Sequence, residues 1–331
     1  MLFTKVRIAP HRARSLLAGC LAIFFAGQAL AAETYPSRSV RLIIPFAPGG
    51  TTDLIARVVA QKMAGVWGQP IVIDNRGGAT GQIGTEMVAN SAPDGYTILM
   101  NSAGLVTDAN FRKLPYNTAK AFTPITNAAN TPYFLFANPS FPVNSVKELI
   151  ALAKAKPDQV TFGSSGIGGA VHLSGEMFNA LAGVRLLHVP YKGTGAAMTA
   201  LVAGEINLVF TGLPTGQQFV KNGRLKIIAT AGSKRSSFYP DIPTIAEAGV
   251  PGYAADNWFG FFGPAGLPPE VENKIAETTA RALATPDVQE QLRQLGAVPV
   301  GNSPAEFKAD FQSEIVRWGQ VIHERGIKQE K

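Results

Sequence analysis

The stretch LIIPFAPGGTTD, residues 42–53, runs from an apolar segment directly into a loop of small and hydroxyl-bearing residues, and a helical pattern follows it. This order predicts a β-strand, a tight loop and a helix whose first backbone N–H groups lack partners. Because Gly49 and Gly50 add no side-chain bulk, and the helix dipole adds positive potential, the loop suits an anion. The alternative is an ordinary turn in which Thr51 or Thr52 is the helix N-cap.

Asp53 lies in the first turn of the same predicted helix. A carboxylate there favours the ordinary turn over an anion site, because it would repel a bound carboxylate unless it points away or holds a water molecule. If the loop binds an anion, Gly50 is expected to have a positive φ and to leave space for the ligand. Valine at this position would then block binding, because a β-branched side chain fills that space.

Two further stretches repeat the construction. VTFGSSGIGGAVH, residues 160–172, and HVPYKGTGAAMTAL, residues 188–201, each run from an apolar strand through a glycine-rich loop into a helix. Small-residue loops at several helix N-termini predict anion binding by the loops together. Within these stretches Lys192 could offer charge to a carboxylate and Tyr191 a hydroxyl or a ring wall. His172 lies either at the rim of a ligand site or in the packed interior.

Several other functions fit the loops poorly. None has the lysine followed by Ser or Thr of a phosphate-binding loop, or the glycine spacing of a dinucleotide fold, so small carboxylates are better candidates than nucleotides. Ser164 or Ser165 could be a nucleophile, but the stretch lacks the Gly-x-Ser-x-Gly elbow, and no histidine stands at an obviously paired position. The sequence therefore predicts no enzyme and no cofactor. Arg76, Gly77 and Gly78, after the apolar run IVIDN, are interpreted as a turn at a sheet edge.

Residues 1–31 are predicted to be a secretory signal peptide, with a basic start, a short apolar middle and small residues at the cut. Cleavage after Ala31 would leave 331 − 31 = 300 residues, and the loss of four basic residues would lower the net charge from +7 to +3. A mature protein in the periplasm is expected. Cys20 lies in a pattern that a lipoprotein peptidase reads, but the better apolar run lies beyond it, so a lipid anchor at Cys20 is not expected.

Composition excludes further classes of function. Without the leader the chain has no thiol, which excludes a cysteine nucleophile, a disulfide framework and a thiolate metal site. The remaining histidines, His172, His188 and His323, have no metal-ligand spacing, so no metal is predicted. No basic face with interleaved aromatic residues indicates a nucleic-acid partner.

Apolar, β-branched runs predict strands in an α/β fold with largely parallel sheets. They lie at residues 39–46, 70–74, 96–100, 159–163, 184–190, 206–210 and 225–230. Extended runs at 123–138 and 225–232 bracket an α/β set, which predicts a second domain joined by two crossing strands, with a hinge and a ligand cleft. The predicted domains are residues 32–130 with 233–331, and residues 131–232.

Three helices are predicted from their caps. Ser145 is the expected N-cap of a helix over residues 146–155, and Ser303 of a helix over residues 304–325. A single long helix is expected from Pro268 to Leu295, ended by Gly296.

Four stretches in combination resemble one family: PFAPGGTTD, IVIDNRGGATGQIGTEMVANSAPDGYTIL, GSSGIGGAVHL and HVPYKGTGAAMTALVAGEINLVF. They are similar to the Bug (TctC-like) solute-binding receptors of tripartite tricarboxylate transporters, from about Tyr35 to the C-terminus. The resemblance implies a type II periplasmic-binding-protein fold, in which two α/β domains on a two-strand hinge close over a carboxylate, partly through ordered waters. It implies ligand contacts at Phe46, Ala47, Gly49, Gly50, Thr51, Thr52, Asp53, Gly163, Ser164, Ser165, Gly166, Tyr191, Lys192, Gly193 and Thr194.

Two positions depart from the family pattern. Many relatives carry an acidic residue where this chain has Thr211, and a polar residue where it has Ile167. Without a carboxylate the site lacks a partner for a ligand ammonium, so a di- or tricarboxylate or an aromatic acid is expected rather than an amino acid. The expected protein is a monomeric receptor that delivers this acid to membrane transporter subunits. The alternatives are a receptor that feeds a sensor kinase, or a secreted carboxylate-ester hydrolase.

Overall fold

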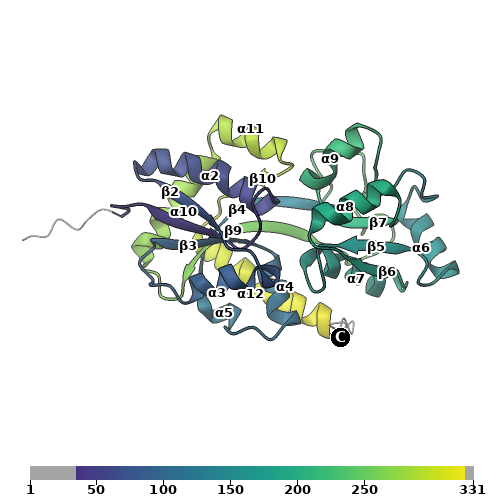
Figure 1. Cartoon of the computed structure of the whole chain (residues 1–331), viewed down its shortest axis with the longest axis horizontal. Helices are drawn as coiled ribbons and strands as arrows, with labels where there is room; N and C mark the ends of the chain where they lie inside the picture. Colours follow the sequence, from purple (N-terminus) through teal and green to yellow (C-terminus); the bar gives the residue numbers. More distant parts are fainter. Residues whose placement is uncertain (1–34, 325–331) are drawn as a thin grey trace, which may run out of the picture. The chain divides into compact units, whose positions relative to one another are not determined.

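A computed structural model describes residues 35–324, which leaves the predicted signal peptide and Cys20 outside the described residues. The elements (Figure 1) are β1 (Val40–Ile44), α2 (Thr51–Trp67), β2 (Ile71–Asn75), η1 (Ala79–Gly81), α3 (Gln82–Ala89), β3 (Thr97–Ser102), α4 (Gly104–Phe111), α5 (Thr118–Ala121), β4 (Phe122–Ala137), α6 (Val146–Ala155), β5 (Thr161–Ser164), α7 (Ala170–Ala182), β6 (Leu187–Pro190), α8 (Thr194–Ala203), β7 (Leu208–Gly212), α9 (Leu213–Lys221), β8 (Lys226–Thr230), β9 (Asp256–Pro264), α10 (Pro269–Leu283), α11 (Pro286–Gln294), β10 (Val298–Pro299) and α12 (Pro304–Glu324). Within this range no helix has both the length and the apolar character needed to cross a membrane.

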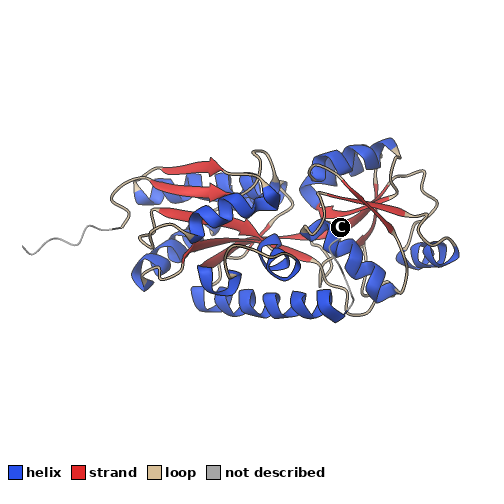
Figure 2. Cartoon of the chain, turned by 60° about the horizontal axis from the view of Figure 1, so that its bottom comes forward, coloured by secondary structure: helices blue, strands red, loops and turns tan. Residues whose placement is uncertain are grey.

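The strands form one ten-stranded sheet in the order β2-β1-β3-β9-β4-β7-β5-β6, with β8 and β10 also paired to β4. Strand β4 is shared by two groups of strands. Residues 122–132 of β4 pair with β9, and residues 133–137 pair with β7. We call β2, β1, β3 and β9 the first half of the sheet, and β5, β6, β7 and β8 the second half. Helices lie beside the strands of both halves (Figure 2).

The prediction of largely parallel sheets is wrong, because the sheet is mixed. The pairs β1–β2, β1–β3, β5–β6 and β5–β7 are parallel. The pairs of β9 with β3 and β4, and those of β4 with β7, β8 and β10, are antiparallel. The chain returns from the second half along β9, which inserts between β3 and β4 and runs against both.

All seven predicted strand runs are strands, whereas β9 was not predicted. Its sequence DNWFGFFGP contains glycine, proline and asparagine, which are depleted in strands and hide an otherwise apolar run. The run at 225–232 forms β8, which pairs with β4 in the second half only. The chain then returns through residues 231–255, where Ala231 N donates to Tyr133 O (2.7 Å) and Ala255 N donates to Ala231 O (2.8 Å). The predicted domain boundaries stay a prediction.

The helix caps explain which helix predictions are confirmed. Glu148 N donates to Ser145 Oγ (3.2 Å) at the start of α6, and Glu306 N donates to Ser303 Oγ (3.3 Å) at the start of α12. The single helix from Pro268 to Leu295 is wrong: α10 ends at Leu283 and α11 begins at Pro286. Proline has no N–H and disfavours helical backbone before it, so it starts a new helix.

Strand β9 and helix α12 meet through aromatic side chains. Phe262 lies 5.2 Å from both Phe307 and Phe311 between ring centroids, and Trp258 lies 5.5 Å from Phe307. The contact is close because β9 has a glycine under the Phe307 ring: a Cβ on Gly260 would lie 2.2 Å from Phe307 Cζ. Gly260 thus makes β9 hard to recognise in the sequence and at the same time allows α12 to pack on this strand.

Gly260→Ala is expected to destabilise the protein by about 1–3 kcal/mol, because the new methyl group overpacks the Phe307 contact. Gly65→Ala is the matched control. Gly65 is exposed within α2, and no atom lies within 4 Å of an added Cβ, so the change should stabilise by about 0.5–1 kcal/mol through helix propensity. Urea unfolding of the two variants measures both effects. Equal stability of the two variants would contradict the packing described for β9 and α12.

Candidate functional site

Four loops follow the carboxyl ends of parallel strands in the two halves of the sheet. Loop 1 (residues 45–50) follows β1, loop 2 (76–81) follows β2, loop 3 (165–169) follows β5, and loop 4 (191–193) follows β6. In open α/β sheets, ligands bind outside the carboxyl ends of the strands. Loops 1, 3 and 4 end at the N-termini of α2, α7 and α8, and each of these helices has a glycine at its N-cap.

The four loops lie next to one another. A Cβ on Gly81 of loop 2 would lie 3.2 Å from Phe46 Cε1 of loop 1, and one on Gly169 of loop 3 would lie 3.9 Å from Thr80 Cγ2 of loop 2. Gly193 N of loop 4 donates to Ser165 O of loop 3 (3.4 Å). The fold thus brings together three of the stretches singled out in the sequence, from both halves of the sheet.

The helix that follows loop 1 is not capped by a threonine, as the interpretation of loop 1 as an ordinary turn requires. Gly50 is the N-cap of α2, so the prediction of a Thr51 or Thr52 cap is wrong. The expected positive φ of Gly50 is also wrong, because its φ is −74°, whereas φ of Gly49 is +81°. The left-handed turn therefore depends on Gly49, and Gly50 has a conformation that any residue can adopt.

Asp53 is turned into the protein and holds loop 1. Its Oδ2 accepts hydrogen bonds from Gly49 N (2.9 Å) and Arg57 Nε (2.9 Å), and its Oδ1 accepts from Arg57 Nη2 (3.0 Å) and Asn75 Nδ2 (3.0 Å). Asn75 Nδ2 also donates to Phe46 O (3.1 Å). Burial would raise the pKa of the Asp53 carboxyl, but the hydrogen bonds from Arg57, Gly49 and Asn75 together lower it. The carboxylate thus fixes the loop and is paired with a cation.

Loop 3 is held from beneath by buried side chains. Ser164 Oγ accepts a hydrogen bond from Gly166 N (3.1 Å) and lies 2.6 Å from His188 Nε2. His172 Nδ1 accepts from Gly168 N (3.1 Å). Gly166 and Gly168 have φ of +133° and +83°, which only glycine adopts readily. Two amides of the loop are therefore already paired with the protein.

No histidine stands at an obviously paired position in the sequence, but the fold brings His188 against Ser164, the last residue of β5. The pair nevertheless lacks the arrangement of a catalytic triad. Ser164 is fully buried, and His188 Nδ1 has no hydrogen-bond partner among residues 35–324, so no third group orients the ring.

Both histidines are buried and uncharged at neutral pH. Burial lowers the pKa of His188 to about 4, and burial together with the neighbouring His188 lowers the pKa of His172 to about 3. The two ring centroids are 4.0 Å apart, and the ring of Phe162 is stacked on His172 at 6.3 Å. A side chain that is 2% exposed belongs to the packed interior in this conformation, so ligand contact by His172 stays a prediction.

The remaining predicted residues lie in loop 4, at the start of α8 and in β7. Tyr191 is half-buried, and its backbone N donates to Ser164 O (3.1 Å), whereas Lys192 is exposed. Thr194 is the first residue of α8, after Gly193 with φ of +96°. Thr211 is buried at the end of β7, with its Oγ1 3.4 Å from Thr215 Oγ1.

Loop 2 was interpreted as a turn at a sheet edge, and its place between loops 1 and 3 was missed. Ala79 and Thr80 have φ of +47° and +58°, an uncommon conformation for non-glycine residues that marks a constrained segment. The sequence signal was present: RGGATG follows a strand and precedes a helix, like the other loops.

Phe111 and Arg112, at the end of α4, connect the first half of the sheet to loop 3. Arg112 Nη2 donates to Ile167 O, and a Cβ on Gly168 would lie 2.4 Å from Phe111 Cδ1. Arg112 Nε lies 3.3 Å from Asp108 Oδ1, and burial, against the opposing effect of Arg112, raises the pKa of Asp108 to about 7. No sequence pattern marked these residues, because they lie on a helix 55 positions from their partner.

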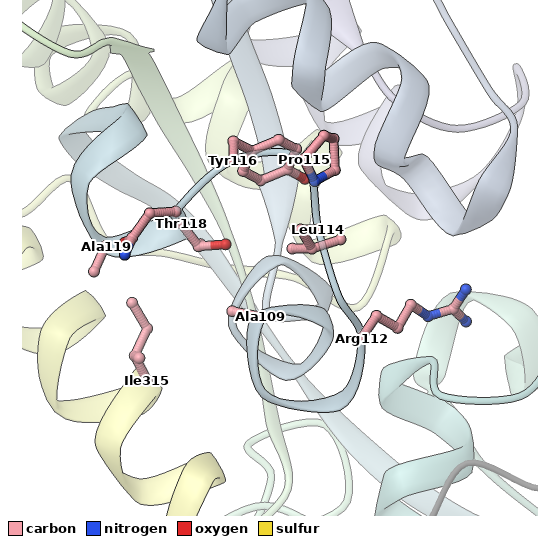
Figure 3. A pocket seen from close by; sticks show the side chains of 9 residues that line it. Ala109, Arg112, Leu114, Pro115, Tyr116, Thr118, Ala119 and Ile315 are labelled. Carbon is pink, nitrogen blue, oxygen red and sulfur yellow. The ribbon is translucent and has the colours of Figure 1, made fainter.

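A pocket of ≈540 Å³ lies beside α4 (Figure 3), and no residue of the four loops lines it. It is lined by Ala109, Arg112, Leu114, Pro115, Tyr116, Asn117, Thr118, Ala119 and Ile315. The guanidinium of Arg112 extends away from the other labelled side chains, so the pocket receives mainly its aliphatic stem. None of the predicted ligand residues lines this pocket. Across residues 35–324, no group of three His, Cys, Asp or Glu side chains could hold a metal ion.

Asp53→Asn is expected to lower the free energy of unfolding by about 1–3 kcal/mol, because the new NH₂ group faces a donor in either orientation. Since the pKa of Asp53 is lowered, its contribution is present at neutral pH and is lost as the pH falls below about 4. Urea unfolding at pH 7 measures the loss. Glu277→Gln, in an exposed pair with Arg281 four residues later on α10, is the control and should change little. Equal losses in the two variants would show that Asp53 does not hold loop 1.

Known proteins resemble the chain over most of its length. The family model described as "Tripartite tricarboxylate transporter family receptor" matches residues 55–327. BugT of Bordetella pertussis is 34% identical over 319 residues, which cover 94% of this chain and 98% of BugT. The solved structure of R. palustris Rpa4515 with adipate has a TM-score of 0.82 at 36% identity, covering 89% of this chain and 99% of that one. MatC of Rhodopseudomonas palustris with bound malate has a TM-score of 0.79 at 34% identity, covering 87% and 100%.

These likenesses confirm the predicted fold class, since solved periplasmic binding proteins share it. They also confirm that the chain is a receptor and not an enzyme, because the matched family is one of receptors. The family match covers residues 55–327. This range includes most of the mixed sheet that β4 joins and the glycine loops that precede α7 and α8. The chain belongs to the tripartite tricarboxylate transporter receptor family, the Bug (TctC-like) solute-binding receptors.

Proposed function

We propose that this receptor captures a small carboxylate in the periplasm, as a monomer, and delivers it to the membrane subunits of a tripartite tricarboxylate-type transporter. The observation that carries the proposal is that loop 2 lies next to both loop 1 and loop 3, so helix N-termini from both halves of the sheet are close together. Amides of a first helical turn have no intrahelical acceptor and carry the positive end of the helix dipole. Such groups hold a carboxylate without a charged side chain.

We propose that the residues predicted from the sequence form the site, but that some of them hold a loop in place and do not touch the acid. The amides at the start of α2, α7 and α8, with Phe46, Ala47 and Tyr191, face the acid. Asp53, Ser164 and His172 act from beneath, because each is buried and accepts a hydrogen bond from a loop amide. Lys192 is the exposed middle residue of loop 4, where it can attract a second carboxylate from solvent.

The acid is proposed to be a di- or tricarboxylate or an aromatic acid without an amino group. Thr211 and Ile167 stand where relatives carry acidic and polar residues, and neither offers charge to an ammonium. Asp53, the only acid in the four loops or in the first turns that follow them, is already paired with Arg57. A buried ammonium without a partner is costly. The adipate and malate bound to Rpa4515 and MatC belong to the proposed class of acids.

Binding is proposed to involve closure of two domains, residues 32–130 with 233–331 and residues 131–232. Strand β4 and residues 231–255 are the connections between the two halves of the sheet, so a hinge would lie there. The contacts of Phe111 and Arg112 with loop 3 would hold the closed form. A receptor that feeds a sensor kinase would need the same site, so ligand binding alone does not distinguish it from a transport receptor.

A thermal-shift screen of organic acids is expected to raise the melting temperature with small di- or tricarboxylates or aromatic acids. A ligand at 100 times its dissociation constant adds about 2.7 kcal/mol to the stability of the folded state. The screen includes malate, adipate, benzoate and citrate, with amino acids and nucleotides as other classes. Shifts with other classes and none with a carboxylate would refute the proposal.

Gly50→Val is expected to abolish carboxylate binding while leaving the fold intact. The backbone of Gly50 has an ordinary φ, and an added Cβ would meet only Ala47 O at 3.5 Å, so the side chain obstructs the ligand rather than the loop. Lys192→Ala should weaken binding about tenfold to a hundredfold, as expected for loss of a charge-assisted hydrogen bond. Calorimetry on variants whose fold is verified by circular dichroism decides this. Near-normal affinity of Gly50→Val would mean that loop 1 is only a turn.

A further inference from the structure

Loops 1 and 3 are held by the same local device, although different side chains form it. In loop 1, Gly49 N donates to the side chain of Asp53, four residues later. In loop 3, Gly168 N donates to the side chain of His172, also four residues later. Both acceptors are the third residue of the helix that follows, and both glycines precede its N-cap. His172 thus occupies the place in α7 that Asp53 occupies in α2.

The hydrogen-bond network assigns the protons of both histidines. His172 Nδ1 accepts from Gly168 N, so its proton is on Nε2, 3.8 Å from Glu176 Oε1. Ser164 Oγ accepts from Gly166 N and lies 3.1 Å from Gly166 O, to which its hydroxyl donates. His188 Nε2–H then donates to Ser164 Oγ, which leaves Nδ1 as a bare acceptor rather than a buried N–H without a partner.

Neutral imidazoles are required for this arrangement. A protonated His172 presents an N–H to the N–H of Gly168 and loses that hydrogen bond. It also places a charge beside the ring of His188, whose centroid is 4.0 Å away. The other titratable or charged groups that face this cluster are Glu176 on α7, Tyr253, whose hydroxyl donates to Ser174 O, and the Arg112–Asp108 pair of α4. Glu176 is the one acid on the same helix, at 3.8 Å.

We infer that His172, with Ser164 and His188, is a positioning residue of the proposed ligand site, which fixes loop 3 by removing the Gly166 and Gly168 amides from the ligand. The first-turn amides of α7 then remain as the donors for a carboxylate. Loop 3 differs from loop 1 in that its acceptor, His172, is neutral and needs no cation such as Arg57 to balance it. The link to a ligand rests on the proposed function, whereas the hold on the loop does not.

The test combines a measurement without ligand and one with adipate on the full mature chain. Long-range ¹H–¹⁵N NMR of the wild type at pH 7 should show Nε2–H tautomers for His172 and His188. Amide exchange at Gly168 should be about tenfold faster in His172→Leu than in the wild type, and near wild type in His172→Asn, whose side-chain oxygen can replace Nδ1 as acceptor. His323→Asn, at an exposed position of α12, is the matched control and should change nothing.

Adipate affinity should fall about tenfold in His172→Leu and recover in His172→Asn. A protonated Nδ1 in the wild type, or unchanged Gly168 exchange in a folded His172→Leu, would overturn the inference. Faster exchange with unchanged adipate affinity would overturn the role in the ligand site. If the wild type binds no carboxylate while Gly168 exchange accelerates in His172→Leu, the proposed function fails and the hold on loop 3 stands.

Discussion

The backbone pairing of β4 with two groups of strands is the constraint on which the rest of this structure depends. Its residues 122–132 pair with β9 and its residues 133–137 with β7, so one continuous strand fixes both halves of the sheet to each other. The parallel pairs β1–β2 and β5–β6 stand at opposite ends of the strand order. Their carboxyl ends carry loops 1, 2, 3 and 4, and the contacts between these loops exist because β4 brings the two ends into one sheet.

Buried side chains accept hydrogen bonds from some of the loop amides and leave others unpaired. A glycine-rich loop before a helix has more free N–H groups than one carboxylate can bind, and an excess of mobile donors would not define one geometry. Asp53 and His172 each pair with the amide before the N-cap, and Ser164 pairs with Gly166 N. The amides that remain are those of the first helical turns, which the helix geometry orients. Preorganisation of this kind lowers the entropy cost of binding.

Two arginines interact with these loops, Arg57 through Asp53 and Arg112 through a backbone carbonyl. Arg57 neutralises Asp53, so that the carboxylate beneath loop 1 does not oppose an anion. Arg112 reaches from α4 to the carbonyl of Ile167, and Phe111 beside it packs against Gly168. These contacts stabilise only the conformation in which loop 3 lies against α4. A shift of α4 would therefore change the stability of that loop conformation.

The sequence by itself determined the local features of this protein. Hydrophobic runs located seven strands, the serine caps located α6 and α12, and the order of strand, glycine loop and helix located loops 1, 3 and 4, because each of these signals depends on residues close in the chain. Only the tertiary structure decided the antiparallel place of β9, the role of loop 2, the contact of Ser164 with His188 and the reach of Arg112. These depend on partners 24 to 55 positions away or on neighbouring strands, and no local pattern encodes which distant backbone a strand pairs with or which buried ring a hydroxyl meets.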